Sequence, residues 1–483
     1  MSTEDHHDEE DMQVLNEDDA AEEIINEDGD LVMDSDEDIF LQNDSIAYFD
    51  EPKDSLFTIA QHPVQPSIVA VGGSAGQEDD APGAGWVIDT SSAPSKPVLP
   101  ASFASNPAAQ PEEGFPLQSV YNLDGHTDSI NSLCFTFPKG EVLVSGGLDG
   151  RIRAWTVEAN PGSPIKVSPL GETQEVEEVN WIAPCPSPEN PNTVAFGAND
   201  GSVWVYTIDP SDPSNPFQIV QSYFLHTASC TAGAWSPDGQ MLVTVSEESS
   251  LYVWDVWGAA AAKGLVGDNG MSIIAMTGED QRFEVEGGLY SVAVDPKGTF
   301  IAAGGAGGAI KIVSMPRLSG AAAGGKGGKS GADSAGGQIL ASLHAQSDGV
   351  ESLSIVLAST TPPTLLLAAG SVDGSICVFD ATRQFAVRRN IVGAHEEHSV
   401  VKVEFIKDSW TLTSCGMDGV VRRWDLRGTT TAGTTAADSG LIKEWKGHRG
   451  DGEGGGILGF VQGQTGERII TAGDDGVSLV FEA

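Results

Sequence analysis

The sequence has few basic residues and no long apolar run. Its 483 residues include 25 Lys and Arg against 70 Asp and Glu. A surface with this balance should repel nucleic acids and anionic membranes and attract a basic protein or peptide. No apolar run reaches the roughly 18 residues of a membrane-spanning helix. The first residues, MSTEDHHDEE, lack the basic region and apolar core of a secretory signal. We expect a soluble, cytoplasmic protein that binds neither membranes nor nucleic acids directly, and nuclear entry stays open.

Cysteine is also scarce, and its pattern excludes several classes of site. The cysteines are odd in number, scattered and without a CxxC pair, which argues against a disulfide framework and a zinc site and favours a reducing compartment. The Gly-rich stretch 319 to 338 holds lysines but no GxxxxGK[ST] motif, so it is interpreted as a flexible linker. We expect no metal and no cofactor. The five cysteines are Cys134, Cys185, Cys230, Cys377 and Cys415.

The acidic residues are concentrated at the N-terminus but not confined to it. Residues 1–44 hold 19 of the acids and no Lys or Arg, and the remaining chain still carries a formal charge of about −26. Residues 1–44 are predicted to be a disordered acidic tail. The tail either takes part in binding or only keeps the protein soluble. Residues 45–483 are predicted to form one domain.

An internal repeat dominates the rest of the chain. The segments DGHTDSINSLCFTFPKGEVLVSGGLDGRIRAW, from Asp124, and GAHEEHSVVKVEFIKDSWTLTSCGMDGVVRRW, from Gly393, share the order His, strand, turn, strand, Asp-Gly and a third strand ending in Trp. They resemble WD repeats, which implies that four residues form a buried hydrogen-bonded relay. A buried Asp needs such partners. Because the set recurs at the repeat period, this structural role is favoured over a catalytic Ser-His-Asp triad. The relay residues are His126, Ser145, Asp149 and Trp155, and His395, Ser414, Asp418 and Trp424.

Weaker copies fill the remaining chain and bring the number of units to eight, with seven as the alternative. The fold class is therefore an all-β WD-repeat β-propeller, whose ring of four-stranded blades leaves only short, protected edges. One unit, GGLYSVAVDPKGTFIAAGGAGGAIKIV, has lost the relay residues, and the first unit has strand patterning alone. The other copies keep Asp200; His226, Glu248 and Trp254; His344 and Asp373; and His448 and Asp475.

The two ends of the domain are predicted to pair. In WD repeats the outer strand of a blade comes from the following repeat, so the unit ending at Phe481 lacks an outer strand. The spare strand is SIAYFD, Ser45–Asp50. It should pair with GVSLVF and close the ring, which protects an edge that would otherwise favour aggregation.

The two faces of the ring differ in composition. Insertions follow the third strand of a unit at 90–114, 209–216, 258–270, 319–338 and 428–440, and are expected to be flexible loops on the bottom face. The top face carries the relay His loops and Asp turns. Its expected basic residue is Arg449, with His398 as a neutral or switchable neighbour. Its expected acids are Glu247 and Asp474 ahead of the relay Asp positions, Glu178 and Glu351 near first-strand starts, and Asp348, Glu396, Glu397, Asp451, Glu453, Glu78, Asp79 and Asp80 in loops and turns.

A ring of carboxylates on a concave face would attract Arg and Lys, with an affinity that falls as salt rises. Exposed acids scattered over an acidic protein are the alternative interpretation. A general WD-repeat scaffold or a histone-binding adaptor would also fit such a face. An enzyme is disfavoured, because no metal cluster, nucleotide loop or nucleophile with a nearby base stands outside the repeats.

One resemblance is more specific. The acidic tail, the segment IAYFDEPKDSLFTIAQHP and the ending AGDDGVSLVF resemble the dedicated chaperones of large-subunit ribosomal protein uL16, a family similar to angio-associated migratory cell protein. The resemblance implies a monomer that captures the basic N-terminal segment of newly made uL16 on its top face, meets ribosomes transiently and delivers its client to pre-60S particles. The implied client-binding residues are Glu178, Glu247, Glu351, Glu397, His398, Asp474, Asp348 and Asp451.

Overall fold

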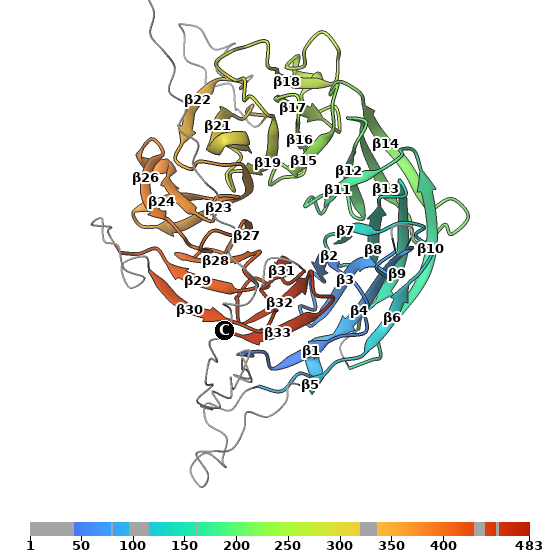
Figure 1. Cartoon of the computed structure of the whole chain (residues 1–483). Helices are drawn as coiled ribbons and strands as arrows, with labels where there is room; N and C mark the ends of the chain where they lie inside the picture. The colour runs from blue at the N-terminus through green and yellow to red at the C-terminus, as the bar shows by residue number, and fades with distance from the viewer. Residues whose placement is uncertain are drawn as a thin grey trace, which may run out of the picture. The chain divides into compact units, whose positions relative to one another are not determined.

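Each repeat unit folds into an antiparallel sheet of four strands, and eight such blades close into a ring (Figure 1). This confirms the predicted fold and the larger of the two blade numbers. In this computed structural model the described residues are 43–78, 81–95, 115–160, 162–318, 336–428, 440–450 and 454–483. Residues 1–42 of the predicted tail lie outside them. The first strand of each blade lines the inside of the ring, and the fourth forms its outer edge (Figure 1).

The first four blades follow in chain order. Blade 1 consists of β2 (Leu56–Gln61), β3 (Ile68–Ser74), β4 (Gly83–Asp89) and β6 (Ser119–Leu123). Blade 2 consists of β7 (Ile130–Phe135), β8 (Val142–Gly147), β9 (Arg151–Glu158) and β10 (Lys166–Gln174). Blade 3 consists of β11 (Val179–Pro184), β12 (Thr193–Ala198), β13 (Val203–Ile208) and β14 (Phe217–Tyr223). Blade 4 consists of β15 (Cys230–Trp235), β16 (Met241–Ser246), β17 (Ser250–Asp255) and β18 (Ser272–Met276).

The other four blades complete the ring. Blade 5 consists of β19 (Leu289–Val294), β20 (Phe300–Gly305), β21 (Ala309–Ser314) and β22 (Ile339–His344). Blade 6 consists of β23 (Val350–Thr360), β24 (Pro363–Ser371), β25 (Ile376–Asp380) and β26 (Ala386–Ile391). Blade 7 consists of β27 (Val400–Phe405), β28 (Thr411–Gly416), β29 (Val421–Asp425) and β30 (Leu441–Trp445). Blade 8 begins with β31 (Ile457–Val461), β32 (Arg468–Gly473) and β33 (Ser478–Glu482).

The second strand of each blade lies in the core. In blades 2 to 5 all six residues of this strand are buried, because neighbouring blades cover both of its faces. Buried apolar side chains form eight clusters, each joining two adjacent blades. Val144 of β8 and Phe196 of β12, for example, share one cluster. Packing between blades thus holds the ring, so blade 5 keeps the fold without relay residues.

The N-terminal strand closes the ring as predicted. β1 (Ala47–Phe49) pairs antiparallel with β33, with Ala47 opposite Val480. A further strand was not predicted: β5 (Phe115–Pro116), just after the insertion 90–114, pairs parallel with β1 and covers its outer side. The edge of blade 8 is therefore protected by two segments from the other end of the chain.

The insertions are more ordered than the sequence suggests where they are described. The segments 209–216 and 258–270 join third to fourth strands in blades 3 and 4, as expected. Segment 258–270 is not a loose loop, however. It contains the 3₁₀ turn η3 (Ala261–Lys263), and Ala260 is fully buried. The Ala261 amide donates to Asp255 Oδ2 over 2.7 Å. Residues 96–114, 319–335 and 429–439 lie outside the described residues.

Candidate functional site

The same backbone hydrogen bond recurs in all eight blades and defines one rim of the ring. The residue before the relay Asp position donates its amide to the carbonyl of the residue before the first strand, over 2.9 to 3.3 Å. We call these eight pairs the top rim. They are Ser74 with Ser55, Leu148 with Ser129, Asn199 with Glu178, Glu247 with Ser229, Ala306 with Gly288, Val372 with Gly349, Met417 with Ser399, and Asp474 with Gly456.

Predicted client-binding carboxylates occupy this rim. Glu178, Glu247 and Asp474 are themselves rim residues of blades 3, 4 and 8. Asp348 immediately precedes rim residue Gly349 of blade 6, and Glu351 follows it by two residues. In blade 7, Glu397 and His398 immediately precede rim residue Ser399. Five of the eight blades thus present acids on the rim. Asp451, Glu453, Asp79 and Asp80 lie outside the described residues.

Most of these rim acids are open to a partner. Glu178, Glu247, Asp348, Glu351 and Glu397 are all exposed. None of these five carboxylates forms an ion pair with a described residue. They are therefore available to Lys or Arg from outside.

Glu351 is the rim acid with the most perturbed electrostatics. Although its side chain reaches solvent, partial burial raises the pKa of Glu351, and the neighbouring Asp348 raises it further. Two carboxylates that crowd one another in this way would both be stabilised by a cation. A cation beside Glu351 and Asp348 would relieve the repulsion between these two carboxylates.

Asp474 has a structural role beside its place on the rim. Ser55 Oγ of blade 1 donates to Asp474 Oδ1 over 2.6 Å, which ties the last blade to the first. Asp474, which the sequence marked for client binding, thus also joins two blades. Asp475, one residue later, accepts from His448 Nδ1 at 3.0 Å, and His448 Nε2 lies 2.8 Å from Thr471 Oγ1.

The relay residues of blade 2 lie just beneath the rim. His126 Nδ1 lies 3.0 Å from Asp149 Oδ1, and its Nε2 lies 2.7 Å from Ser145 Oγ. Trp155 is buried in the same blade. Its indole makes no hydrogen bond to Ser145 within the described part of the chain, so three of the four predicted members are joined by hydrogen bonds.

Blade 7 has all four relay members in contact. His395 lies 2.8 Å from both Asp418 Oδ1 and Ser414 Oγ, and Trp424 Nε1 donates to Ser414 Oγ over 2.9 Å. Burial acts to raise the pKa of Asp418, but bonds and charges from His395 and then Arg422 lower it to about 2. Ser414 and His395 are fully buried, as a relay that ties strands together requires.

Two degenerate units show relay partners that the sequence did not indicate. In blade 4, Ser250 Oγ stands between His226 Nδ1, at 2.5 Å, and Glu248, at 2.8 Å. In blade 6 the prediction of His344 was wrong, because His344 is exposed on β22. Gln346 takes the position and donates to Ser375 Oγ over 3.1 Å. Spacing gives the missing signal: His126, His226 and Gln346 each stand four residues before the first residue of their blade's first strand.

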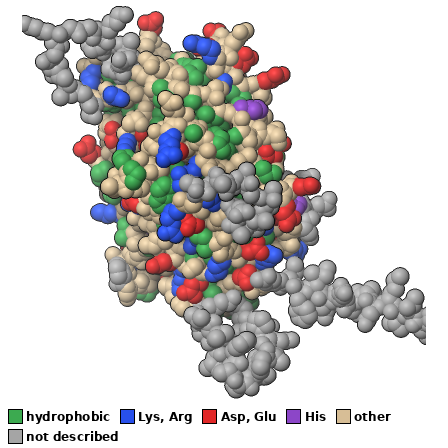
Figure 2. All heavy atoms as spheres, turned by 90° about the vertical axis from the view of Figure 1, so that its left-hand side faces the viewer, with side chains coloured by type: hydrophobic (Ala, Val, Ile, Leu, Met, Phe, Trp, Pro, Cys, Tyr) green, Lys and Arg blue, Asp and Glu red, His purple; other side chains and the backbone are tan. Residues whose placement is uncertain are grey.

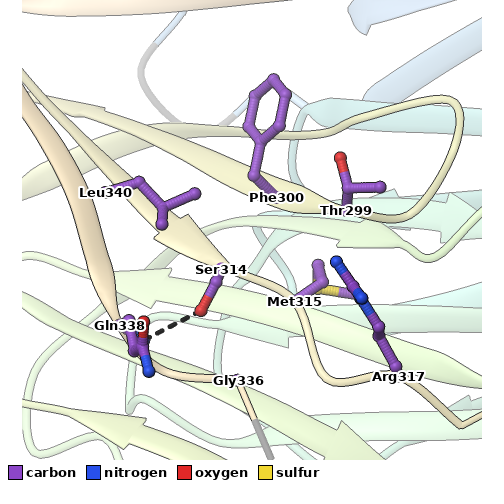
Figure 3. A pocket seen from close by; sticks show the side chains of 8 residues that line it. All are labelled: Thr299, Phe300, Ser314, Met315, Arg317, Gly336, Gln338 and Leu340. Atoms are coloured by element: carbon purple, nitrogen blue, oxygen red, sulfur yellow. Dashed lines mark hydrogen bonds between the residues drawn. The ribbon is translucent and has the colours of Figure 1, made fainter. Parts of the chain in front are cut away.

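The opposite end of blade 5 carries an open cavity of about 360 Å³. Thr299, Phe300, Met315 and Leu340 contribute to its walls, with Arg317 as its charged residue (Figure 3). The backbone amide of Gln338 donates to Ser314 Oγ over 3.0 Å (Figure 3). This lining contains no nucleophile with a base beside it.

Basic side chains are numerous on the outer side of the ring. Figure 2 looks at the side formed by blades 5 to 7 and shows Lys and Arg along its middle, with Asp and Glu among them. Arg427 on this side is paired with Asp425. The described residues contain no group of three His, Cys, Asp or Glu placed to hold a metal ion, and no helix long and apolar enough to cross a membrane. The five cysteines are buried free thiols whose pKa values burial raises.

Comparisons with known proteins agree with the geometry. The WD domain, G-beta repeat, family model matches residues 117–156, 217–255 and 337–380. The ribosome assembly protein SQT1 of Saccharomyces cerevisiae is 27% identical over 484 residues, covering 95% of this chain and 91% of that protein. Human angio-associated migratory cell protein is 23% identical over 364 residues, covering 75% of this chain and 69% of that protein. The crystal structure of Chaetomium thermophilum Sqt1 bound to the N-terminus of the ribosomal protein L10 is 56% identical, with a TM-score of 0.78, and covers 92% of this chain and 100% of that one.

Proposed function

The chain belongs to the Sqt1 family, and on this premise we propose that it is a dedicated chaperone of ribosomal protein L10, the uL16 named above. It binds the basic N-terminal segment of newly made L10 on the top face and delivers the protein to pre-60S particles. The observation that supports this most is the Sqt1 complex with the L10 N-terminus, in a protein 56% identical over 92% of this chain.

The rim explains how such binding would work. Exposed carboxylates on blades 3, 4, 6 and 7, with Asp474 on blade 8, converge on one face and attract Lys and Arg before contact. Ribosomal proteins use these same residues to hold RNA, so an L10 molecule covered by carboxylates is kept from stray RNA and from aggregation. Ribosomal RNA is a polyanion of much higher charge, and it would compete for the same basic residues and release the client.

The proposal extends to enzymatic activity and to the cellular compartment. We propose that the protein has no enzymatic activity of its own, since the buried Ser and His of the repeats serve the blades. It acts in the cytoplasm, where ribosomal proteins are synthesised, and buried thiols without disulfides suit that compartment. A general scaffold role has no specific observation in its favour.

Capture from cells tests the proposal. The full chain with an affinity tag is isolated under low-salt conditions, and the bound proteins are identified by mass spectrometry. We expect L10 to be enriched together with ribosome assembly factors. Enrichment of histones or ubiquitin-ligase subunits without L10 would overturn the proposal in favour of an adaptor.

A further inference from the structure

All eight first strands carry a β-bulge at their second residue. The register with the second strand shifts there in every blade. A bulge re-aims the side chain of the extra residue, and the first strands line the inside of the ring (Figure 1). Eight side chains are thus presented at the top of the inner wall. They are Phe57, Asn131, Asn180, Thr231, Tyr290, Glu351, Val401 and Leu458.

The bulge residues of blades 2 to 4 hold the neighbouring blade. Asn131 Nδ2 donates to the Val179 carbonyl over 2.6 Å, and Thr231 Oγ1 donates to the Leu289 carbonyl over 2.6 Å. Asn180 Nδ2 bonds the Cys230 carbonyl in the same way over 2.9 Å. In blade 5 the Tyr290 hydroxyl donates to the Gly287 carbonyl. These four positions serve the ring itself.

The bulge residues of blades 7, 8 and 1 are apolar instead. Val401, Leu458 and Phe57 lie on β27, β31 and β2, which are consecutive around the inner wall because the ring closes between blades 8 and 1 (Figure 1). Phe57 is 38% exposed and Leu458 is partly exposed, whereas Val401 is partly exposed and packs against the cluster that joins blades 7 and 8. We call these three residues the apolar arc. Apolar side chains that are exposed to solvent close to one another commonly mark a binding surface.

One carboxylate stands beside the apolar arc and another on the rim of its middle blade, and they restrict what can bind there. Glu351 is the bulge residue of blade 6, next to Val401 in the ring order, and Asp474 lies on the rim of blade 8, bonded to blade 1 through Ser55. The acidic residues 1–42 and a second copy of the chain, whose formal charge is −45, would meet like charges here. A basic segment with an apolar side chain between its cations satisfies both features.

We propose that the apolar arc binds one bulky apolar side chain of the basic N-terminal segment of L10. The inference rests on the proposed function and adds a determinant of specificity to it. Carboxylates alone would hold any basic peptide, whereas an apolar subsite among them rejects peptides that lack an apolar residue at the matching place.

Calorimetric titration of the full chain with a synthetic N-terminal peptide of L10 tests the inference. Phe57→Ser should weaken binding about tenfold and make the heat-capacity change of binding less negative. The dependence of affinity on salt should stay unchanged, because no charge is removed. Leu458→Ser provides a second variant, and melting temperatures identify any loss of folding. Ile219→Ser, at a side chain 55% exposed on the outer strand β14 of blade 3, is the matched control and should bind as the wild type does.

Substitution of the peptide identifies the partner side chain. Each apolar peptide residue is replaced by Ser in turn, and one replacement should weaken binding to the wild type about tenfold but leave binding to Phe57→Ser unchanged. Wild-type affinity in both Phe57→Ser and Leu458→Ser would overturn the inference while the proposed function stands. Failure of the wild-type chain to bind the peptide at all would overturn both.

Discussion

Two layers of carboxylates lie at the same end of the blades and perform opposite tasks. Asp418 of the relay layer is buried against His395 and Arg422, which hold its pKa near 2. Glu351 of the rim layer reaches solvent, and its pKa is raised. In the first case the charge is neutralised inside the protein, whereas in the second no described residue forms an ion pair with it. The comparison shows that an acid's task in a repeat follows from its position relative to the turn, since Asp474 and Asp475 are adjacent and differ.

Charge reversal on the rim should have the largest effect. Glu351→Lys is expected to reduce L10 co-purification more than a hundredfold, because it replaces attraction by repulsion at the crowded blade 6 site. The melting temperature should barely move, since Glu351 is exposed. Co-purification of tagged variants from cells provides the measurement.

Glu189→Lys is the matched control for this change. Glu189 is an exposed acid between β11 and β12, at the end of blade 3 opposite to the rim. The same change in net charge there should leave L10 bound. Equal loss from both variants would mean that overall charge, rather than the rim, attracts the client.

Breaking the relay layer should lower stability and leave client binding intact. Asp418→Ala removes the partner of His395 and leaves the buried Arg422 with only the more distant Glu444, so unfolding should become easier by about 3 kcal/mol. Peptide affinity of the folded fraction should stay within twofold of wild type. Denaturant unfolding and titration at low temperature measure the two quantities. Weaker binding without loss of stability would place Asp418 in the binding surface.

Acid should weaken the same relay. The folded pKa of Asp418, about 2, lies below the ordinary 3.8, so its contribution to stability is complete above pH 4 and is lost as the pH falls toward 2. At the rim the pKa shift has the opposite direction. The pKa of Glu351 is raised above the ordinary 4.5, so L10 peptide affinity should fall a few-fold in acid, at a pH where Asp418 is still ionised. Glu351→Gln should reduce this pH dependence, and an unchanged pH profile in that variant would exclude Glu351 as its source.

The smallest expected effect is in blade 6, where the stability changes of Gln346 and His344 variants can be compared. Gln346→Ala loses bonds to the Ser375 hydroxyl and carbonyl and to the Ala369 carbonyl, which should cost roughly 1 to 2 kcal/mol of stability. His344→Ala changes an exposed side chain and should stay within about 0.5 kcal/mol. Chemical unfolding of the two variants distinguishes them, and a larger loss for His344→Ala would restore the sequence-based assignment.

Much of the architecture could be predicted because repeats carry their own register. Asp-Gly turns and alternating strands indicated the eight units, and the missing outer strand after Phe481 pointed to Ser45–Asp50. Rim acids could be located because their spacing from the turn is fixed by the repeat. Gln346 was missed because the WD pattern expects His at this position. Gln fits here because its side chain bonds the hydroxyl of Ser375 instead. The Ser55 bond to Asp474 and the pairing of β5 with β1 join residues far apart in the sequence, and no local pattern predicts them.

Titration of the full chain with the L10 N-terminal peptide across a salt series tests the central claim most directly. We predict that the logarithm of the affinity falls linearly with the logarithm of the salt concentration for the wild type, and that Glu351→Lys shows no measurable binding at any salt concentration. Equal affinities of the wild type and Glu351→Lys, or an affinity of the wild type that does not depend on salt, would contradict the account.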